Sequence, residues 1–232
     1  ERSRGLGDVY KRQSLYSFLK SLNKEDVNIT TIEDPIENNI SGVNQIQVNS
    51  KVNMTFAAAL RAILRQDPNI IMIGEIRDEE TAEIAVKAAI TGHLVLSTLH
   101  TNSAHGTISR LVDMGIPKYL VADALIGAIS QRLVRKLCPN CKKPHMTTPE
   151  EMKELGLTEP VQIYEPGSCG NCNNTGYHGR TGVFEILNMN PTIKKAIEMS
   201  EFSMETIYDA CVSSGMIPLK EAAKKLVLEG VT

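Results

Sequence analysis

A run of four consecutive apolar residues, 70–73, is the clearest hydrophobic pattern in the chain. A short unbroken run of this kind predicts a strand buried on both faces, as in a parallel sheet covered by helices. Gly74 ends the run, and Glu75 and Arg77 follow directly. Open α/β sheets place their ligands beyond the carboxyl ends of the strands, so both side chains are candidates for a catalytic site. The alternative is a buried strand followed by an ordinary helix cap.

Further strands and helices alternate along the chain on both sides of this run. Apolar and β-branched residues predict strands at 28–33, 45–49, 93–100 and 183–187. Apolar residues at helical spacing predict helices at 14–23, 55–65, 79–90, 107–114, 119–137, 149–155, 191–199, 203–213 and 218–229. The alternation, with its short connections, predicts βαβ units and therefore an α/β fold with a mostly parallel sheet.

The first helix is expected to begin near Ser14. Residues 1–13 are rich in Arg, Lys and Gly and carry neither a helical nor a strand period. The buried face of the helix is expected to consist of Leu15, Phe18, Leu19 and Leu22.

Three carboxylates gather where the strand at 28–33 ends. Glu33, Asp34 and Glu37 fall within five residues, and Pro35 stops regular structure between them. Such a corner is either a solvated acidic turn or a place that holds a metal ion and water, and the pattern alone leaves both open.

The strand at 93–100 has a histidine at each end. His93 precedes its apolar residues, and Thr98 and His100 follow them. A histidine beside a strand is most often structural, but Thr and His side chains can also bind a phosphate or respond to its presence. These three residues are therefore candidates for nucleotide sensing.

Composition restricts the class of protein. The 232 residues are 42% hydrophobic and 22% charged, which is typical of a globular protein with one large domain, or one domain and a small appendage. The net charge of −2 gives no general electrostatic reason to bind nucleic acid. No apolar run approaches the roughly 20 residues needed to span a bilayer, so any membrane association is expected to occur through partners.

Four of the five cysteines form two Cys-x-x-Cys pairs separated by 27 residues. Two such pairs can present four thiolates tetrahedrally to zinc, which leaves no open coordination position. We therefore expect a structural rather than a catalytic zinc ion. Its ligands would be Cys138, Cys141, Cys169 and Cys172.

Taken in order, these motifs resemble those of the type II secretion and type IV pilus assembly ATPases, the GspE/PilB group. The resemblance covers residues 14–232 and rests on an aspartate box, an Arg-rich helix end, an atypical Walker B motif, a histidine box, a Gln-Arg-Leu-Val-Arg segment and the tetracysteine pair. In this chain they are Thr31-Ile-Glu-Asp-Pro-Ile-Glu37, Leu60-Arg-Ala-Ile-Leu-Arg-Gln-Asp-Pro68, Ile73-Gly-Glu-Ile-Arg-Asp78, Thr91-Gly-His-Leu-Val-Leu-Ser-Thr-Leu-His-Thr-Asn102, Gln131-Arg-Leu-Val-Arg135 and Cys138 to Arg180.

The resemblance implies a RecA-like P-loop NTPase core and an ATP-driven motor that assembles pilin or pseudopilin. It implies Mg²⁺ with ATP as cofactor, a cytoplasmic homo-hexamer, and docking on an inner-membrane platform protein and a cytoplasmic adaptor. By the same resemblance, Glu75 would orient the attacking water, and Glu33, Asp34 and Glu37 would lie near Mg²⁺. Arg77 would bridge these elements, and His93 and His100 would couple the phosphate state to neighbouring structure.

One departure from the family's pattern concerns the P-loop, Gly-x-x-x-x-Gly-Lys-Ser/Thr, which the family places just before the first helix. Residues 8–13 read Asp-Val-Tyr-Lys-Arg-Gln, and no Gly-Lys-Ser/Thr occurs there. We expect residues 1–13 to be foreign and the chain to be a truncated motor domain with weak ATP binding.

The expected domains are a partial ATPase core at 14–137, a zinc-binding subdomain at 138–182 and a strand with a helical subdomain at 183–232. Two other functions remain open at this point. One is a non-catalytic, zinc-bearing interaction fragment, and the other is a DNA-handling RecA-like ATPase.

Overall fold

The computed structural model describes residues 2–199 and 202–232. Two compact units make up the chain. Unit 1 comprises residues 1–128 and 187–214, and unit 2 comprises 129–186 and 215–232. These divisions differ from the domain limits expected at 137 and 182, since residues 187–214 belong with the first part of the chain.

Unit 1 is an α/β structure built on a four-stranded parallel sheet with the strand order β2-β1-β3-β4. Its strands are β1 (Ile29–Glu33), β2 (Asn44–Gln47), β3 (Ile70–Ile73) and β4 (Leu94–Ser97). Its helices are α1 (Arg2–Leu22), α2 (Phe56–Ile63), α3 (Glu79–Ile90), α4 (Gly106–Asp113), α5 (Lys118–Ala124), α7 (Pro191–Glu198) and α8 (Met204–Ser213), with a short 3-10 turn η1 (Ser50–Val52).

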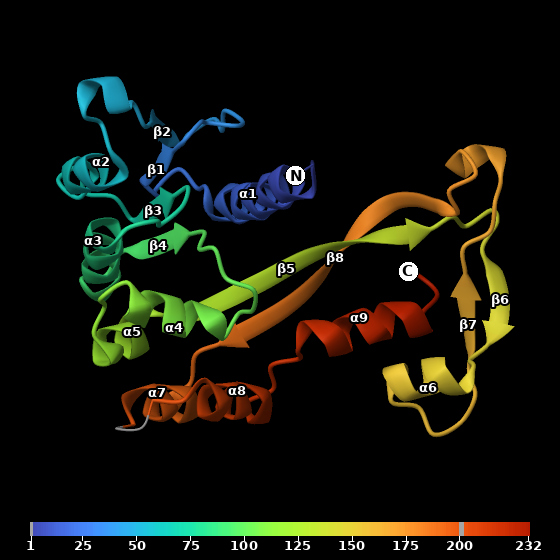
Figure 1. The fold of residues 1–232 in the computed structure, drawn as a ribbon. Helices are drawn as coiled ribbons and strands as arrows, with labels where there is room; N and C mark the ends of the chain where they lie inside the picture. The colour runs from blue at the N-terminus through green and yellow to red at the C-terminus, as the bar shows by residue number, and fades with distance from the viewer. Residues whose placement is uncertain (1, 200–201) are drawn as a thin grey trace. The chain divides into compact units, whose positions relative to one another are not determined.

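Helices cover both faces of this sheet, with α1 on one face and α2 and α3 on the other (Figure 1). Successive side chains of a strand point to opposite faces of the sheet, so each face offers its own apolar residues to the helices. Ile70 and Met72 point towards α1 and pack with Tyr16 and Leu19 in one cluster. All four residues of β3 are buried, as the unbroken apolar run predicts.

Local sequence signals set several of the helix starts. Thr55 accepts a hydrogen bond from the amide of Ala58 and caps α2, while Asp78 accepts one from Thr81 and caps α3. Such caps satisfy amides that the first helical turn leaves without partners. The start of α3 directly after β3 therefore depends on a side chain that the sequence already marks.

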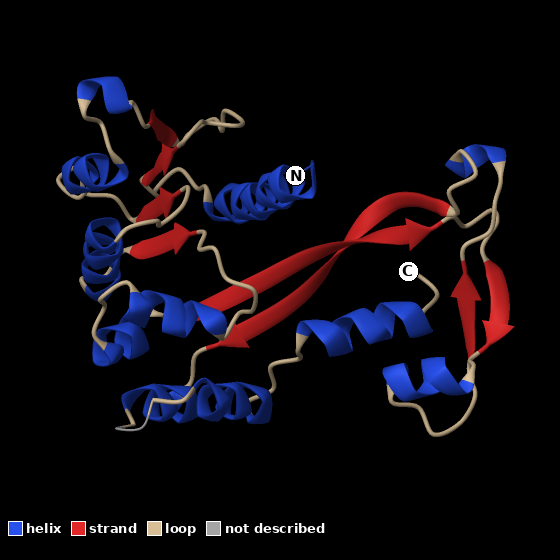
Figure 2. Cartoon of the chain, viewed as in Figure 1, coloured by secondary structure: helices blue, strands red, loops and turns tan. Residues whose placement is uncertain are grey.

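Unit 2 contains the antiparallel pair β6 (Lys143–Met146) and β7 (Gln162–Glu165). It also contains α6 (Pro149–Leu155), the 3-10 turn η2 (Gly170–Cys172) and α9 (Leu219–Leu228). Two long strands, β5 (Gly127–Leu137) and β8 (Tyr177–Asn188), form a separate two-stranded sheet (Figure 2).

The helix predicted at 119–137 was wrong over most of its length. Helix α5 ends at Ala124, and residues 127–137 form β5. The apolar residues there also fit a helical period, but pairing with β8 gives this segment its backbone partners. Gly127 permits the pairing, because a Cβ at this position would lie 2.9 Å from the carbonyl oxygen of Leu187. The strand expected at 183–187 is correspondingly longer and starts at Tyr177.

The first helix also differs from the prediction. It begins at Arg2 rather than near Ser14, so residues 2–13 are helical. On its buried face Leu19 is fully buried and Tyr16 is 5% exposed, whereas Phe18 is 44% exposed. The core therefore accepts a tyrosine in place of the phenylalanine that periodicity favoured. Within the described ranges, no helix has both the length and the apolar character required to cross a bilayer.

The buried face of α1 can be tested by truncation. Leu19→Ala is expected to lower the free energy of unfolding by about 2–5 kcal/mol, because it opens a cavity in a packed core. Phe18→Ala removes a larger but half-exposed side chain and is expected to cost about 1 kcal/mol or less. Urea denaturation followed by circular dichroism measures both, and equal losses would contradict the observed face.

Candidate functional site

Three neighbouring strands of unit 1 end at the same edge of the sheet. The parallel register pairs Ile73 of β3 with Ile32 of β1 on one side and with Ser97 of β4 on the other. The residues that follow each strand therefore lie together. They are the acidic segment at the end of β1 (Glu33, Asp34 and Glu37), Glu75 and Arg77 after β3, and Thr98 and His100 after β4.

Gly74 brings the ends of β1 and β3 into close contact. Its amide donates a hydrogen bond of 2.7 Å to the carbonyl oxygen of Ile32. A Cβ at Gly74 would lie 3.3 Å from that oxygen and 3.4 Å from the Cα of Glu33. A larger residue here would have to push the two strand ends apart.

Thr98, at the end of β4, holds the backbone of residues 74–76 from the side opposite β1. Its hydroxyl donates to the carbonyl oxygen of Gly74 at 2.6 Å, and its own carbonyl oxygen accepts from the amide of Ile76 at 3.0 Å. Residues 74–76 are thus held between the ends of β1 and β4, which fixes the direction of the Glu75 side chain.

Glu75 is a buried carboxylate with two cationic or potentially cationic partners. The residue is 6% exposed, and its two oxygens contact the guanidinium of Arg77 and Nε2 of His100, the latter at 3.3 Å. Burial raises the pKa of Glu75, but the hydrogen bonds and charges of Arg77 and His100 outweigh burial and hold the pKa below its ordinary value. The carboxylate is therefore ionised at neutral pH and available as a base or as an acceptor for water.

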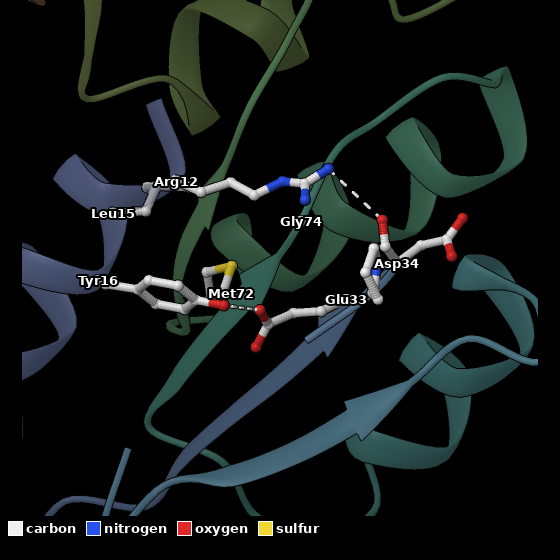
Figure 3. Close-up of a pocket in the computed structure, with 8 residues that line it drawn as sticks. Arg12, Leu15, Tyr16, Glu33, Asp34, Met72 and Gly74 are labelled. Atoms are coloured by element: carbon white, nitrogen blue, oxygen red, sulfur yellow. Dashed lines mark hydrogen bonds between the residues drawn. The ribbon is translucent and has the colours of Figure 1, made fainter. Parts of the chain in front are cut away.

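The acidic segment contains one buried and two exposed carboxylates. Glu33 is 3% exposed and accepts hydrogen bonds from the hydroxyls of Tyr16 and Thr31 and from the amide of Gln45. Figure 3 shows the Tyr16 phenol directed at this carboxylate. Asp34 and Glu37 are exposed.

Arg12 of α1 reaches the same corner. Its guanidinium forms an ion pair with Glu37 and donates to the carbonyl oxygen of Asp34 at 3.5 Å (Figure 3). With Tyr16, Glu33, Asp34 and Gly74 among the lining residues, a small cavity of about 10 Å³ lies here, about the space of one water molecule.

Electrostatics connects the acidic segment to Glu75. The hydrogen bond with Glu75 is the main cause that raises the pKa of Arg77, and the charge of Asp34 acts in the same direction. The Arg77 guanidinium thus forms an ion pair with Glu75 and is close enough to Asp34 to respond to its charge.

The structure brings together seven of the eight predicted site residues of unit 1. The exception is His93, which lies before the amino end of β4 and whose Nδ1 contacts the carbonyl oxygen of Ala88 at 2.9 Å, at the end of α3. Sequence reasoning missed Tyr16 and Gln45. The sequence carried no local signal for them, since periodicity favoured Phe18 over Tyr16 and the pairing of Gln45 with Thr31 is known only from the structure.

The four predicted zinc ligands form one cluster in unit 2, and their sulfur atoms all lie within 4.8 Å of one another. Cys138 and Cys169 are 3.8 Å apart, and Cys141 and Cys172 are 3.7 Å apart. A tetrahedral zinc ion with Zn–S bonds of about 2.3 Å requires sulfur separations of about 3.8 Å. The donor set and its spacing therefore fit zinc.

Backbone groups around the cluster favour thiolate formation at one position. Burial opposes ionisation of Cys172, but contacts with the backbone of Cys169 and with the amide of Gly176 lower its pKa to about 6. Residues of the carboxyl-terminal segment lie against the same subdomain, since Lys142 donates to the carbonyl oxygen of Gly230 at 2.8 Å. The cluster thus lies where several separate segments of unit 2 meet.

Comparison with known proteins gives the family. The family model for "Type II/IV secretion system protein" matches residues 9–232. The chain belongs to this family. It is 49% identical over 222 residues to "Type II secretion system protein E" of Dickeya dadantii (strain 3937), covering 96% of this chain and 44% of that protein.

Pilus motors are also among the relatives. The chain is 48% identical over 228 residues to "Type IV pilus assembly ATPase PilB" of Acinetobacter baylyi (strain ATCC 33305 / BD413 / ADP1), covering 96% of this chain and 39% of the relative. The structure matches the pilus retraction motor PilT with bound ADP at a TM-score of 0.59 and 31% identity, over 90% of this chain and 55% of PilT. The predicted α/β ATPase fold with a parallel sheet is thereby confirmed. The chain spans less than half the length of the two curated relatives.

The metal cluster predicts the outcome of a cysteine substitution. Protein with the native cysteines is expected to hold about one zinc ion per chain, and Cys138→Ser is expected to lose it together with several kcal/mol of stability in unit 2. Elemental analysis and thermal unfolding measure both effects. Cys211→Ala, in α8 and outside the cluster, is the matched control and should keep its zinc. Stoichiometric zinc in Cys138→Ser would contradict the site.

The Glu75 ion pair predicts a pH dependence of stability. Because the folded-state pKa is lowered, the pair stabilises unit 1 at neutral pH, and that stability is lost as the pH falls below about 4.3 and through the folded-state value. Glu75→Gln is therefore expected to be less stable than the native chain by about 1 kcal/mol at pH 7, with a gap that narrows in acid. Chemical denaturation between pH 3 and 7 tests this, with the exposed Glu25→Gln as control. If the difference in stability between the native chain and Glu75→Gln became larger in acid, the lowered pKa of Glu75 would be contradicted.

Proposed function

We propose that this chain is the motor region of an ATP-hydrolysing subunit that powers pilin or pseudopilin assembly in type II secretion or type IV pilus biogenesis. The observation that carries the proposal is Glu75, a buried and ionised carboxylate at the carboxyl end of a central parallel strand. Arg77 and His100 hold it there. The relatives named above are a type II secretion protein and a pilus assembly ATPase, which supports the same function.

In this proposal Glu75 orients the attacking water and accepts its proton. Water bound to a carboxylate oxygen is held in one direction, and a buried carboxylate that stays ionised is ready to act as a base. Arg77 prevents protonation of Glu75 between turnovers and neutralises part of the local negative charge. Mg²⁺ bound with ATP would supply charge neutralisation at the phosphates.

Asp34 and Glu37 are the acidic side chains that would lie near the magnesium ion. Both are exposed at the carboxyl edge of the sheet, and carboxylate oxygens and water are the ligands that Mg²⁺ prefers. Asp34 is also within electrostatic reach of Arg77. A change of charge at the metal would therefore alter the environment of the Glu75–Arg77 pair.

We assign the sensing of the phosphate state to Thr98 and His100. Thr98 bonds the backbone at Gly74, and His100 contacts Glu75. A shift of Glu75 on hydrolysis would reach the end of β4 through these two contacts. His93 contacts the end of α3 instead, so its proposed part in sensing would be indirect, through the position of β4.

The proposed assembly is a homo-hexamer docked on an inner-membrane platform protein and a cytoplasmic adaptor, at the inner face of the bacterial cell membrane. ATP turnover would move subunits relative to one another and drive assembly of the pilin or pseudopilin. The proposed zinc ion is structural, because four protein thiolates complete its coordination and leave no position for substrate.

A chimera tests the proposed activity. Residues 14–232 of this chain would replace the matching region of the Dickeya dadantii relative. The chimera is expected to hydrolyse ATP, and Glu75→Gln within it is expected to lower kcat by about 10²-fold or more while ATP still binds. Phosphate release and binding of a fluorescent ATP analogue measure the two properties.

The exposed Glu83→Gln in α3 is the control for this substitution. It removes one exposed carboxylate of the same unit, whose partner is Lys87 and not a residue of the site, so turnover should be retained. An inactive chimera with native Glu75 would count against the motor function. Full turnover by Glu75→Gln would reject the role of that residue.

A further inference from the structure

Both oxygens of Glu33 accept hydrogen bonds from other side chains of unit 1. One oxygen accepts from Thr31 at 2.6 Å and from Gln45 at 3.0 Å, and the other accepts from the phenol of Tyr16. The residue is 3% exposed. A buried carboxylate is tolerated when donors replace the water that it has lost, and three donors do so here.

The donors to Glu33 belong to one face of the sheet. Thr31 and Glu33 are two residues apart in β1, so their side chains share a face, and Gln45 is the register partner of Thr31 in β2. Tyr16 arrives from α1, which covers that face (Figures 1 and 3). The carboxylate thus joins three elements of unit 1.

Two of these donors also hold the backbone of the acidic segment. The Tyr16 phenol oxygen accepts from the amide of Glu37 at 3.1 Å. The Gln45 side chain accepts from the amide of Ile40 at 2.7 Å and donates to the carbonyl oxygen of Asn38 at 3.0 Å. The segment between β1 and β2 therefore takes part of its shape from side chains of α1 and β2.

We propose that Tyr16 and Gln45 are positioning residues that use the buried Glu33 carboxylate as an anchor to hold the segment carrying Asp34 and Glu37. The proposal divides the three carboxylates by task. Glu33 orients the phenol and the amide, and these hold the backbone of residues 37–40, which carries Glu37. Asp34 lies between this backbone and the anchored Glu33, so both ends of its segment are held. This role in catalysis rests on the function proposed above.

The protonation state of Tyr16 supports the arrangement. Burial raises the pKa of the Tyr16 phenol, and the hydrogen bond to Glu33 acts in the same direction. The phenol therefore keeps its proton at and above neutral pH. It donates to the carboxylate while its oxygen accepts from Glu37, and phenylalanine would lose both contacts while filling the same volume.

Hydrogen exchange of the backbone amides tests the positioning role in the chain itself. Tyr16→Phe is expected to raise the exchange rate of the Glu37 amide by about tenfold, because its acceptor is removed. Gln45→Ala should do the same at Ile40. The amides of β3, buried in the same unit, report the overall stability and should change much less. Thr31→Val is the matched control, since it also removes one donor from Glu33 but no contact to the segment.

The results separate a local role from general destabilisation. Faster exchange at Glu37 in Tyr16→Phe, with protection kept there in Thr31→Val, would support the proposal. It would be overturned by unchanged exchange at Glu37, or by an equal increase throughout β3. This outcome does not depend on whether the protein hydrolyses ATP.

A second arm uses the chimera. Tyr16→Phe is expected to raise the Mg²⁺ concentration for half-maximal turnover several-fold, because Asp34 and Glu37 are less well placed. Tyr119→Phe, which removes an exposed hydroxyl in α5, should leave it unchanged. An unchanged Mg²⁺ requirement in Tyr16→Phe would overturn the catalytic part of the proposal, whereas a chimera inactive with native Tyr16 would instead overturn the proposed ATPase function.

Discussion

The close parallel pairing of β1 with β3 is the constraint on which the candidate site depends. The amide of Gly74 bonds the carbonyl oxygen of Ile32, and the absence of a side chain at Gly74 lets the two strand ends approach. Glu75 and Asp34 come from segments about 40 residues apart in sequence, a separation that loop closure tolerates at low cost. Their nearness follows from this register, and β4 adds Thr98 and His100 to the same edge by the same rule.

Two buried carboxylates in unit 1 are stabilised in different ways. Glu33 is surrounded by neutral donors, which replace its lost hydration, and it anchors neighbouring segments. Glu75 is held by Arg77 and His100, whose charges favour its ionised form. A carboxylate whose two oxygens both accept from neutral donors is suited to structure, whereas one with an exposed cationic partner can exchange contacts with a ligand. Two acidic residues that look alike in the sequence thus have different environments and different proposed tasks.

Several features could be predicted from the sequence because their signals are local. The buried strand at 70–73, the caps at Thr55 and Asp78 and the two Cys-x-x-Cys pairs each rest on a few adjacent residues. The order of these motifs also indicated the family that the family model confirms. Prediction from the sequence failed where the same pattern of apolar residues fits both a helix and a strand. Residues 127–137 fit a helix as well as a strand, and the choice between them depends on β8, which lies about 40 residues further along the chain.

By itself the sequence determined which functional groups are available, namely carboxylates and histidines at strand ends and four thiolates. It also determined the alternation of strands and helices. Only the tertiary structure decided which of these groups meet. In the folded chain His100 contacts Glu75, whereas His93 lies at the other end of β4. Tyr16 is buried in the core and Phe18 is not. The physical reason is that strand alternation and helix periodicity fix the face of each side chain, but only packing between distant segments decides what lies opposite that face.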